Sequence, residues 1–397
     1  MTRGRFAPSP TGRMHLGNVF CALLSWLSAK SKGGEWVLRI EDLDPQRSKK
    51  DYALQLMDDL QWLDLPWDGE PVWQSQRGEI YEEYLQRLTD MGLTYPCYCT
   101  RADIMATQAP HETDGRVVYK GTCRPNTPSP STAQTVPLRQ GDERSGGGGL
   151  QPVHSSPLTV NCSPLTATTR LIVPDCTIPF TDGHYGKHDI NLAEHCGDYI
   201  IRRKDGAWAY QLAVVVDDAL MGVTEIVRGR DLLLSSPQQI HLRNLLFQST
   251  DDRVQMTDGL LKRKTITDAA RSVPTATSFT PQTVPLRQGD ERSGGGGLTA
   301  HHSPFNAHPS PLTVNFFHHP LLCNAEGQRL CKRDKSMDLG YLRDKGTTPQ
   351  EIIGLLAHLA GLTNTPAPIT PQELIPLFSW DKVPTEDIIL NNLQEAL

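Results

Sequence analysis

The stretch Arg5-Phe-Ala-Pro-Ser-Pro-Thr-Gly-Arg-Met-His-Leu-Gly-Asn18 organises the chain. It is typical of a short strand that enters a turn rich in proline and glycine. A helix is expected next, because apolar residues recur at helical spacing; they are Val19, Phe20, Leu23, Leu24 and Leu27. A helix that begins at such a turn directs several unpaired backbone N–H groups and the positive end of its dipole outward, and these can hold phosphate. His15 and Asn18 should lie at that helix start.

The composition is that of an ordinary globular protein. The chain has 397 residues, enough for two or three domains, with 38% hydrophobic and 21% charged residues. No apolar run is long enough to span a bilayer and the N-terminus has no secretory pattern, so the cytoplasm is expected. Nine cysteines, an odd number, fit reduced thiols and a metal site better than a disulfide framework. A net charge of −6 predicts no broad basic surface, so any RNA contact must come from local patches.

Glu35-Trp-Val-Leu-Arg-Ile-Glu-Asp-Leu-Asp44 predicts a second, central parallel strand that ends in acidic residues. Glu41 should then emerge at the carboxyl edge of the sheet, where doubly wound folds bind their ligands. A helix with a buried apolar stripe is expected after it; the stripe comprises Tyr52, Leu56, Met57, Leu60 and Leu63. Three tryptophans are expected to pack in the core; they are Trp62, Trp67 and Trp73.

Two further stretches predict the second half of the sheet. The segment from Gly197 to Asp218 has the pattern of a hairpin around Lys204-Asp-Gly206, followed by a buried segment. The segment from Met221 to Asp231 predicts a strand that brings Arg228 to an edge and leads into a helix.

Three cysteines have the spacing of a metal site. Cys97-Tyr-Cys99 is expected at the end of a helical stretch, and Cys123 follows a loop that begins after Cys99. Three thiolates can form three corners of a tetrahedral zinc site, but a fourth cysteine or histidine is missing. Tyr119 is the candidate fourth ligand, and inert reduced thiols are the alternative.

The chain also contains an internal repeat. Residues 134–150 recur without change as residues 282–298, and residues 156–161 recur as residues 310–315. These segments are rich in glycine, proline and charge and have little to bury, so we expect two flexible insertions. Phosphate binding by the glycine run is the less favoured alternative, because no strand precedes it and no Lys-Ser/Thr follows it.

The C-terminal region should be short and helical. Thr348-Pro-Gln-Glu351 and Thr370-Pro-Gln-Glu373 both have the pattern of a capping box with proline in the first turn. The first opens an apolar helix over Ile352 to Leu359.

These motifs resemble the class I aminoacyl-tRNA synthetases. Pro-Ser-Pro-Thr-Gly followed by His-x-Gly resembles their ATP-binding signature in the form that the glutamate group uses, and residues 197–231 resemble the second half of that group's Rossmann fold. The segment Asn324-Ala-Glu-Gly aligns Arg329-Leu-Cys-Lys-Arg333 with the Lys-Met-Ser-Lys-Ser loop, with Lys332 as its second lysine. This chain departs from the pattern with Arg329 for the first lysine and Cys331 for serine. The register over Lys332-Arg-Asp-Lys-Ser336 is rejected.

The resemblance extends to the glutamyl-Q tRNA(Asp) synthetases, which share the Cys, Cys, Tyr, Cys zinc pattern and have too short a C-terminal region for an anticodon-binding domain. It implies an α/β fold with a doubly wound parallel Rossmann-type sheet, split by a zinc-containing insertion and followed by a short helical C-terminal region. We divide the chain into residues 1–90 and 186–345 as the two catalytic halves, residues 91–185 as the zinc insertion and residues 346–397 as the C-terminal region. The flexible inserts are expected at about residues 127–168 and 250–315.

That family activates glutamate with ATP and transfers it to queuosine at the wobble position of tRNA(Asp). The resemblance implies ATP contacts and catalytic roles for His15 and Lys332, further ATP contacts from Gly17 and Asn18, Mg²⁺ bound with ATP, one structural Zn²⁺ and a monomer that binds no membrane. The residues implied in glutamate binding are Arg5, Ala7, Ser9, Glu41, Tyr210 and Arg228. The implied zinc ligands are Cys97, Cys99, Tyr119 and Cys123. Two alternatives remain: a shortened glutamyl-tRNA synthetase that charges the tRNA 3′ end, and an inactive nucleotide-binding paralogue.

Overall fold

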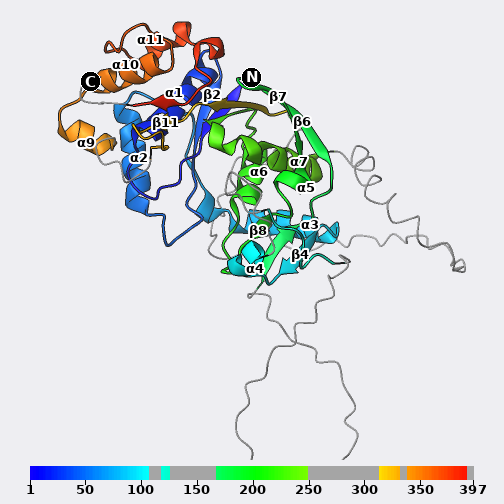
Figure 1. The fold of residues 1–397 in the computed structure, drawn as a ribbon. Coiled ribbons are helices and arrows are strands. Elements are labelled where there is room, and N and C mark those ends of the chain that lie inside the picture. The colour runs from blue at the N-terminus through cyan, green and yellow to red at the C-terminus, as the bar shows by residue number, and fades with distance from the viewer. Residues whose placement is uncertain (107–117, 126–166, 249–312, 331–337, 391–397) are drawn as a thin grey trace, which may run out of the picture.

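A central, mostly parallel sheet organises the protein (Figure 1). The computed structural model describes residues 1–106, 118–125, 167–248, 313–330 and 338–390. The seven strands lie in the order β3-β2-β1-β9-β10-β6-β7, and all neighbours pair in parallel except the hairpin β6–β7. Their bounds are β1 Arg3–Phe6, β2 Glu35–Ile40, β3 Val72–Trp73, β6 Thr177–Asp182, β7 Gly186–Asn191, β9 Glu225–Gly229 and β10 Asn315–His319.

Helices cover the sheet in two groups. The N-terminal and C-terminal helices are α1 Leu16–Lys30, α2 Lys50–Trp62, α9 Leu339–Asp344, α10 Pro349–Leu359 and α11 Pro371–Leu374. The other α-helices are α3 Gly78–Asp90, α4 Arg101–Ala106, α5 Leu192–His195, α6 Tyr210–Leu220 and α7 Ser236–Phe247. Short 3₁₀ turns are η1 Gln74–Gln76, η3 Arg230–Ser235, η5 Ile375–Leu377 and η6 Trp380–Lys382. Among the described residues, no helix has both the length and the apolar character to cross a membrane.

The first strand, turn and helix are as predicted. Alternation along β2 sends Trp36, Leu38 and Ile40 to the face that α1 covers, while Val37 packs on the opposite face. The five apolar residues predicted on α1 are fully buried, and the three predicted tryptophans pack at the edge of the same core. Helix α2 also forms, with Leu56 and Leu60 buried.

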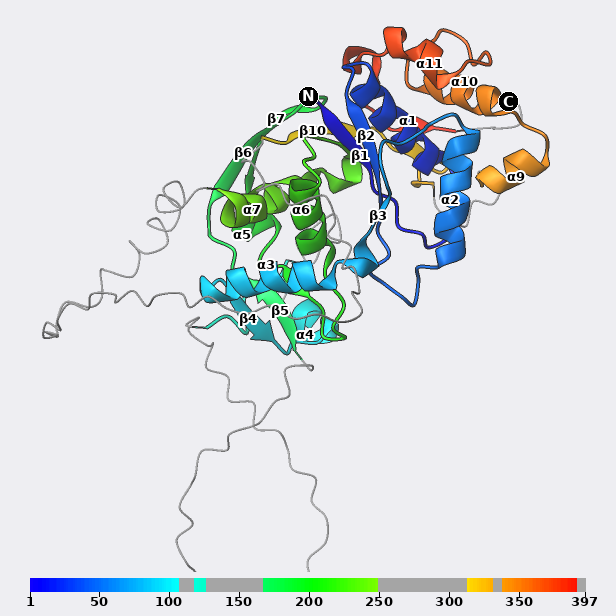
Figure 2. The same ribbon diagram turned by 180° about the vertical axis from the view of Figure 1, so that it is seen from behind.

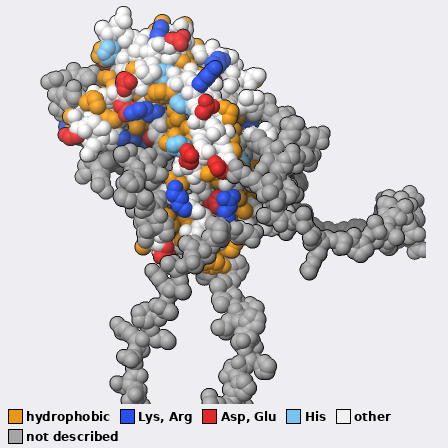
Figure 3. Space-filling view, turned by 45° about the vertical axis from the view of Figure 1, so that its right-hand side comes forward, with side chains coloured by type: hydrophobic (Ala, Val, Ile, Leu, Met, Phe, Trp, Pro, Cys, Tyr) orange, Lys and Arg blue, Asp and Glu red, His pale blue; other side chains and the backbone are white. Residues whose placement is uncertain are grey.

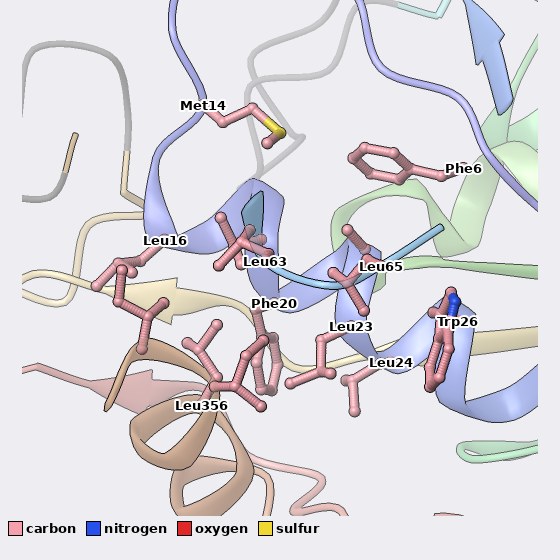
Figure 4. Close-up of a cluster of buried hydrophobic side chains, with 14 of the residues drawn as sticks. Phe6, Met14, Leu16, Phe20, Leu23, Leu24, Trp26, Leu63, Leu65 and Leu356 are labelled. Atoms are coloured by element: carbon pink, nitrogen blue, oxygen red, sulfur yellow. The ribbon is translucent and has the colours of Figure 1, made fainter. Parts of the chain in front are cut away.

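The C-terminal helices complete this core. Helices α10 and α11 lie over α1 (Figure 1), and Leu356 of α10 lies beside Phe20 of α1 (Figure 4). Both predicted capping boxes are present, because the Thr348 and Thr370 side chains accept hydrogen bonds from the backbone N–H three residues later. The short parallel pair β11 Leu322–Cys323 and β12 Ile388–Ile389 joins the C-terminal segment to the end of β10.

A second core lies at the other end of the molecule. Helices α3, α6 and α7 surround it, and a small antiparallel sheet, β4-β5-β8, packs below α3 (Figure 2). Its strands are β4 Thr94–Cys97, β5 Thr168–Leu171 and β8 Ile200–Arg202. The hairpin predicted around Lys204-Asp-Gly206 follows β8, with Gly206 at φ 83°, where a residue with a side chain is strained.

Two local predictions near the cysteines were wrong. The helix ends at Asp90, and Cys97 ends strand β4, because Thr94 to Cys97 pair with Thr168 to Leu171 far along the chain. The interval after Cys99 is also not all loop, because helix α4 begins in it. Thr100 and Asp103 cap that helix reciprocally, a pattern that the sequence carries.

The repeats lie largely outside the described residues, as do the glycine runs. The exception is the end of the second copy, where Asn315 begins β10 and its N–H donates to Thr224 O at 2.9 Å. Thr168 likewise begins β5. The approximate ranges of the two insertions stay a prediction, and the residues at their C-terminal ends, Thr168 and Asn315, lie in paired strands.

We expect Leu356→Ala to lower the free energy of unfolding by about 2–5 kcal/mol, because it leaves a cavity between α10 and α1. Leu356 is fully buried, whereas Leu54 on α2 is 50% exposed. The matched change Leu54→Ala should cost less than about 0.5 kcal/mol. Urea unfolding measures both, and equal losses would show that α10 does not stabilise this core.

Candidate functional site

A cavity of about 490 Å³ opens at the carboxyl ends of β1, β2 and β9. The chain leaves β1 toward β2 on one side, while β9 lies on the other, so this is the position where the strand order reverses and α/β sheets bind ligands. Residues from the first turn, the start of α1 and the segment around Leu330 complete the wall. Every predicted ATP or glutamate residue that the structure describes lines this cavity: Arg5, Ala7, Ser9, His15, Gly17, Asn18, Glu41, Tyr210 and Arg228.

His15 is the N-cap of α1. Its Nδ1 accepts a hydrogen bond from Gly17 N–H at 3.1 Å, and Asn18 Oδ1 accepts one from His15 N–H at 3.1 Å. A Cβ atom at residue 17 would lie 3.0 Å from His15 Nδ1, so glycine there leaves room for this cap. The amides of the first turn are thus partly used within the helix, contrary to our expectation that they are unpaired. Because Nδ1 accepts, the neutral ring carries its proton on Nε2.

Arg228 is a buried cation surrounded by neutral acceptors. It is 3% exposed and donates to His318 Nε2 at 3.0 Å, Gln239 Oε1 at 2.8 Å and Ser236 Oγ at 2.8 Å. Burial lowers its pKa, opposed mainly by the neighbouring Tyr210. These bonds use three of the five guanidinium N–H donors, and Tyr210, which also lines the cavity, is a further partner of the guanidinium.

A second group of charges lies under the cavity floor. Arg39 is fully buried and donates to Asp218 Oδ1 at 2.6 Å and to Glu41 Oε1 at 3.1 Å. Arg5 Nε lies 3.4 Å from Asp218 Oδ1, and its terminal nitrogen donates to Val227 O at 3.1 Å. Burial raises the pKa of Glu41, whereas Arg39 and Arg5 hold that of Asp218 below its ordinary value against the effect of burial.

Lys332 lies outside the described residues, but the chain on both sides of it is at the cavity. Arg329 and Leu330 line the cavity and precede it, and Arg329 pairs with Asp231. Asp338 follows it and forms a β-bridge with His15.

The three predicted cysteines form a cluster at the small sheet. Their Sγ atoms lie within 4.8 Å of one another, with Cys99 and Cys123 at 3.5 Å. Tyr119 Oη lies 3.4 Å from Cys97 Sγ and 3.7 Å from Cys99 Sγ. Burial would raise the pKa of Cys123, but hydrogen bonds, first from Tyr119, lower it to about 7, which favours the thiolate that a metal requires. This cluster could hold one metal ion.

Known proteins are similar to this chain in sequence and in fold. The family model for the catalytic domain of class I tRNA synthetases (E and Q) matches residues 1–133 and 161–261. A glutamyl-Q tRNA(Asp) synthetase of Symbiobacterium thermophilum is 36% identical over 398 aligned residues, covering 98% of this chain and 95% of the relative. One from Neisseria meningitidis serogroup C is 44% identical over 246 residues, covering 62% of this chain and 72% of the relative.

The chain belongs to the glutamyl-Q tRNA(Asp) synthetase family. A solved glutamate tRNA ligase from Elizabethkingia meningosepticum, in complex with its amino acid, has the same fold at a TM-score of 0.63. That structure is 22% identical and the match covers 100% of this chain and 68% of the ligase. This chain therefore has the synthetase fold.

The surface of this family member carries mixed charge. On the face in Figure 3, acidic and basic side chains are interspersed over the described residues that are visible. This agrees with the net charge of −6. RNA contacts on this face would therefore come from local groups.

Sequence reasoning missed the charges that support the site. Arg39 lies between the apolar residues Leu38 and Ile40 of β2, and Asp217 and Asp218 follow the apolar run of α6. A charged residue inside an apolar segment is the signal that could have found them, because burying a charge requires a partner.

We expect Asp218→Ala to lower the free energy of unfolding by about 3–5 kcal/mol, because it leaves Arg39 and Arg5 buried without this partner. The control is Asp58→Ala. Asp58 also pairs with an arginine, Arg343 at 2.7 Å, but its side chain is 64% exposed, so the loss should stay below about 1 kcal/mol. Chemical denaturation measures the free energy of unfolding of both variants. Similar losses in the two would contradict the stabilising role of the buried network.

Proposed function

We propose that this protein joins glutamate to AMP without tRNA and then transfers the glutamyl group to queuosine at the wobble position of tRNA(Asp). The observation that carries the first step is the convergence of Arg5, Glu41 and Arg228 beside the start of α1 in one cavity. The glutamyl-Q tRNA(Asp) synthetase relatives support the acceptor.

Glutamate would bind through its charges. Arg228 is the candidate partner of a carboxylate, because it lines the cavity and its described hydrogen-bond partners are neutral. Arg5 is the second candidate, and Glu41 is the candidate partner of the ammonium group. Ser9 and Tyr210 would add hydrogen bonds, while Ala7 forms wall.

ATP would bind over the start of α1, with Gly17 and Asn18 beneath it. In the first step a glutamate carboxylate oxygen attacks the α-phosphorus, the bond to the bridging oxygen breaks, and pyrophosphate leaves. Negative charge grows on the phosphate oxygens, and the Nε2–H of His15 and the ammonium of Lys332 would stabilise it. Mg²⁺ on the phosphates would supply further positive charge. No base is needed, because glutamate is already ionised.

Zinc fits the cysteine cluster. In a tetrahedral site with bond lengths of about 2.3 Å to sulfur and 2.0 Å to oxygen, neighbouring ligand atoms lie roughly 3.5–3.8 Å apart. The observed separations of 3.4, 3.5 and 3.7 Å are close to these values. Cys97, Cys99, Tyr119 and Cys123 would hold one structural Zn²⁺ that ties β4 to the turn before Cys123. We further propose a monomer and a cytoplasmic location, the latter consistent with the lack of a disulfide among the described cysteines.

Purified protein should exchange pyrophosphate with ATP when glutamate is present and tRNA is absent. Lys332→Ala should reduce this exchange about 100-fold or more, because it removes a charge from the transition state. Lys382→Ala, a change on the C-terminal 3₁₀ turn η6, is the control and should leave the rate unchanged. Absence of exchange in the wild type would overturn the proposed function, and a normal rate in Lys332→Ala would overturn the loop register.

The acceptor is identified by incubating the enzyme with radiolabelled glutamate and tRNA(Asp) with and without queuosine. Label should appear only in the anticodon fragment of the queuosine tRNA. Label at the 3′-terminal adenosine would instead indicate a shortened glutamyl-tRNA synthetase.

Elemental analysis should find about one zinc per chain in the wild type. Cys123→Ser should bring this close to zero, because it removes one of the three thiols of the cluster. The matched control Cys196→Ser changes a cysteine outside the cluster and should retain the metal. Unchanged zinc in Cys123→Ser would remove the assignment.

A further inference from the structure

Arg228 contacts a buried histidine, His318, which in turn contacts a buried aspartate, Asp182. His318 on β10 is fully buried, and both of its ring nitrogens have partners, with Nε2 also 3.4 Å from Ser236 Oγ. Nε2 faces Arg228 Nε at 3.0 Å, and Nδ1 faces Asp182 Oδ2 at 2.6 Å. Neither Asp182 nor His318 lines the described part of the cavity. The pair therefore acts on a ligand only through Arg228.

The directions of the two hydrogen bonds of His318 are set by Arg228. The Nε–H of an arginine can only donate, so His318 Nε2 must accept. The proton of the neutral imidazole then sits on Nδ1 and is donated to the carboxylate of Asp182. Burial lowers the pKa of His318, opposed by Asp182, so the ring stays neutral beside the guanidinium.

Asp182 is itself held firmly. It is 1% exposed, and its Oδ1 accepts the backbone N–H groups of His184 at 3.0 Å and Tyr185 at 2.9 Å. Its other oxygen, Oδ2, is left to receive the imidazole proton of His318. Hydrogen bonds from His318, His184 and Tyr185 lower the pKa of Asp182 against the effect of burial.

We propose that Asp182 is a positioning residue for amino-acid binding: it fixes His318 in the Nδ1–H form, so that Nε2 accepts from Arg228 and orients its guanidinium for a substrate carboxylate. This rests on the proposed function of Arg228. One terminal nitrogen of Arg228 donates to Gln239, the other donates to Ser236, and Nε donates to His318. The whole guanidinium plane is thereby oriented.

Asp182→Asn tests the proposal because the two side chains have the same shape. The amide oxygen can keep the bonds from His184 and Tyr185, so the NH₂ group faces His318 Nδ1 and donates to it. The imidazole proton must then move to Nε2, where it opposes the Nε–H of Arg228. We expect the KM for glutamate in pyrophosphate exchange to rise roughly tenfold to hundredfold, with the KM for ATP unchanged.

Asp189→Asn is the matched control, because Asp189 lies exposed on the other strand of the same hairpin. It should leave both KM values unchanged. Nitrogen-15 NMR of the histidine side chains gives a second readout, with the His318 signals assigned by their loss in His318→Gln. The wild type should show Nδ1–H and Asp182→Asn should show Nε2–H.

If Asp182→Asn does not fold, two variants of His318 test whether an acceptor at this position orients Arg228. His318→Gln offers a carbonyl oxygen to Arg228, whereas His318→Leu offers no acceptor, so the glutamate KM should be lower in the first. Equal values for the two, an Nε2–H signal in the wild type, or an unchanged glutamate KM in folded Asp182→Asn would overturn the proposal. If the wild type does not exchange with glutamate, the proposed function fails, and the nitrogen-15 signals still decide whether Asp182 sets the proton position.

Discussion

The buried guanidinium of Arg39 joins the three elements that form the cavity floor. It comes from β2 and binds Asp218 of α6 and Glu41 beyond the end of β2, while Asp218 also lies beside Arg5 of β1. Charges this deeply buried are tolerated only with partners in good geometry, so the group holds strand ends and helix in one arrangement.

The two buried arginines show how the same side chain can serve structure or binding. Arg39 is compensated by carboxylates, so little of its charge is left for a ligand. Arg228 is held by an imidazole, an amide and a hydroxyl, which orient it without cancelling its charge. An anion entering beside Arg228 would therefore gain a full electrostatic interaction in a site already organised to receive it. Such preorganisation lowers the cost of ordering on binding.

Long-range pairing explains where the sequence-based predictions failed. The prediction of a helical stretch ending at Cys97 was wrong because the local sequence gives no sign of β5, the partner strand, which begins at Thr168. A glycine- and proline-rich repeat can likewise end in a residue that pairs with a neighbouring strand, as Asn315 does with Glu225 of β9. Strand pairing is a tertiary property, and composition reports it poorly. The domain division itself stays a prediction.

The sequence by itself determined the first strand, turn and helix, the capping boxes at Thr348 and Thr370, and the residue types of the site, because helical periodicity and capping are local. The tertiary structure alone decided which of these residues meet. It brought Arg228 to within hydrogen-bonding distance of His318, and His318 to Asp182, across 136 residues of chain. It also showed that Arg39 and Asp218 form a pair. The physical reason is that partners of buried charges are chosen by sheet order and strand register, which depend on contacts between distant segments.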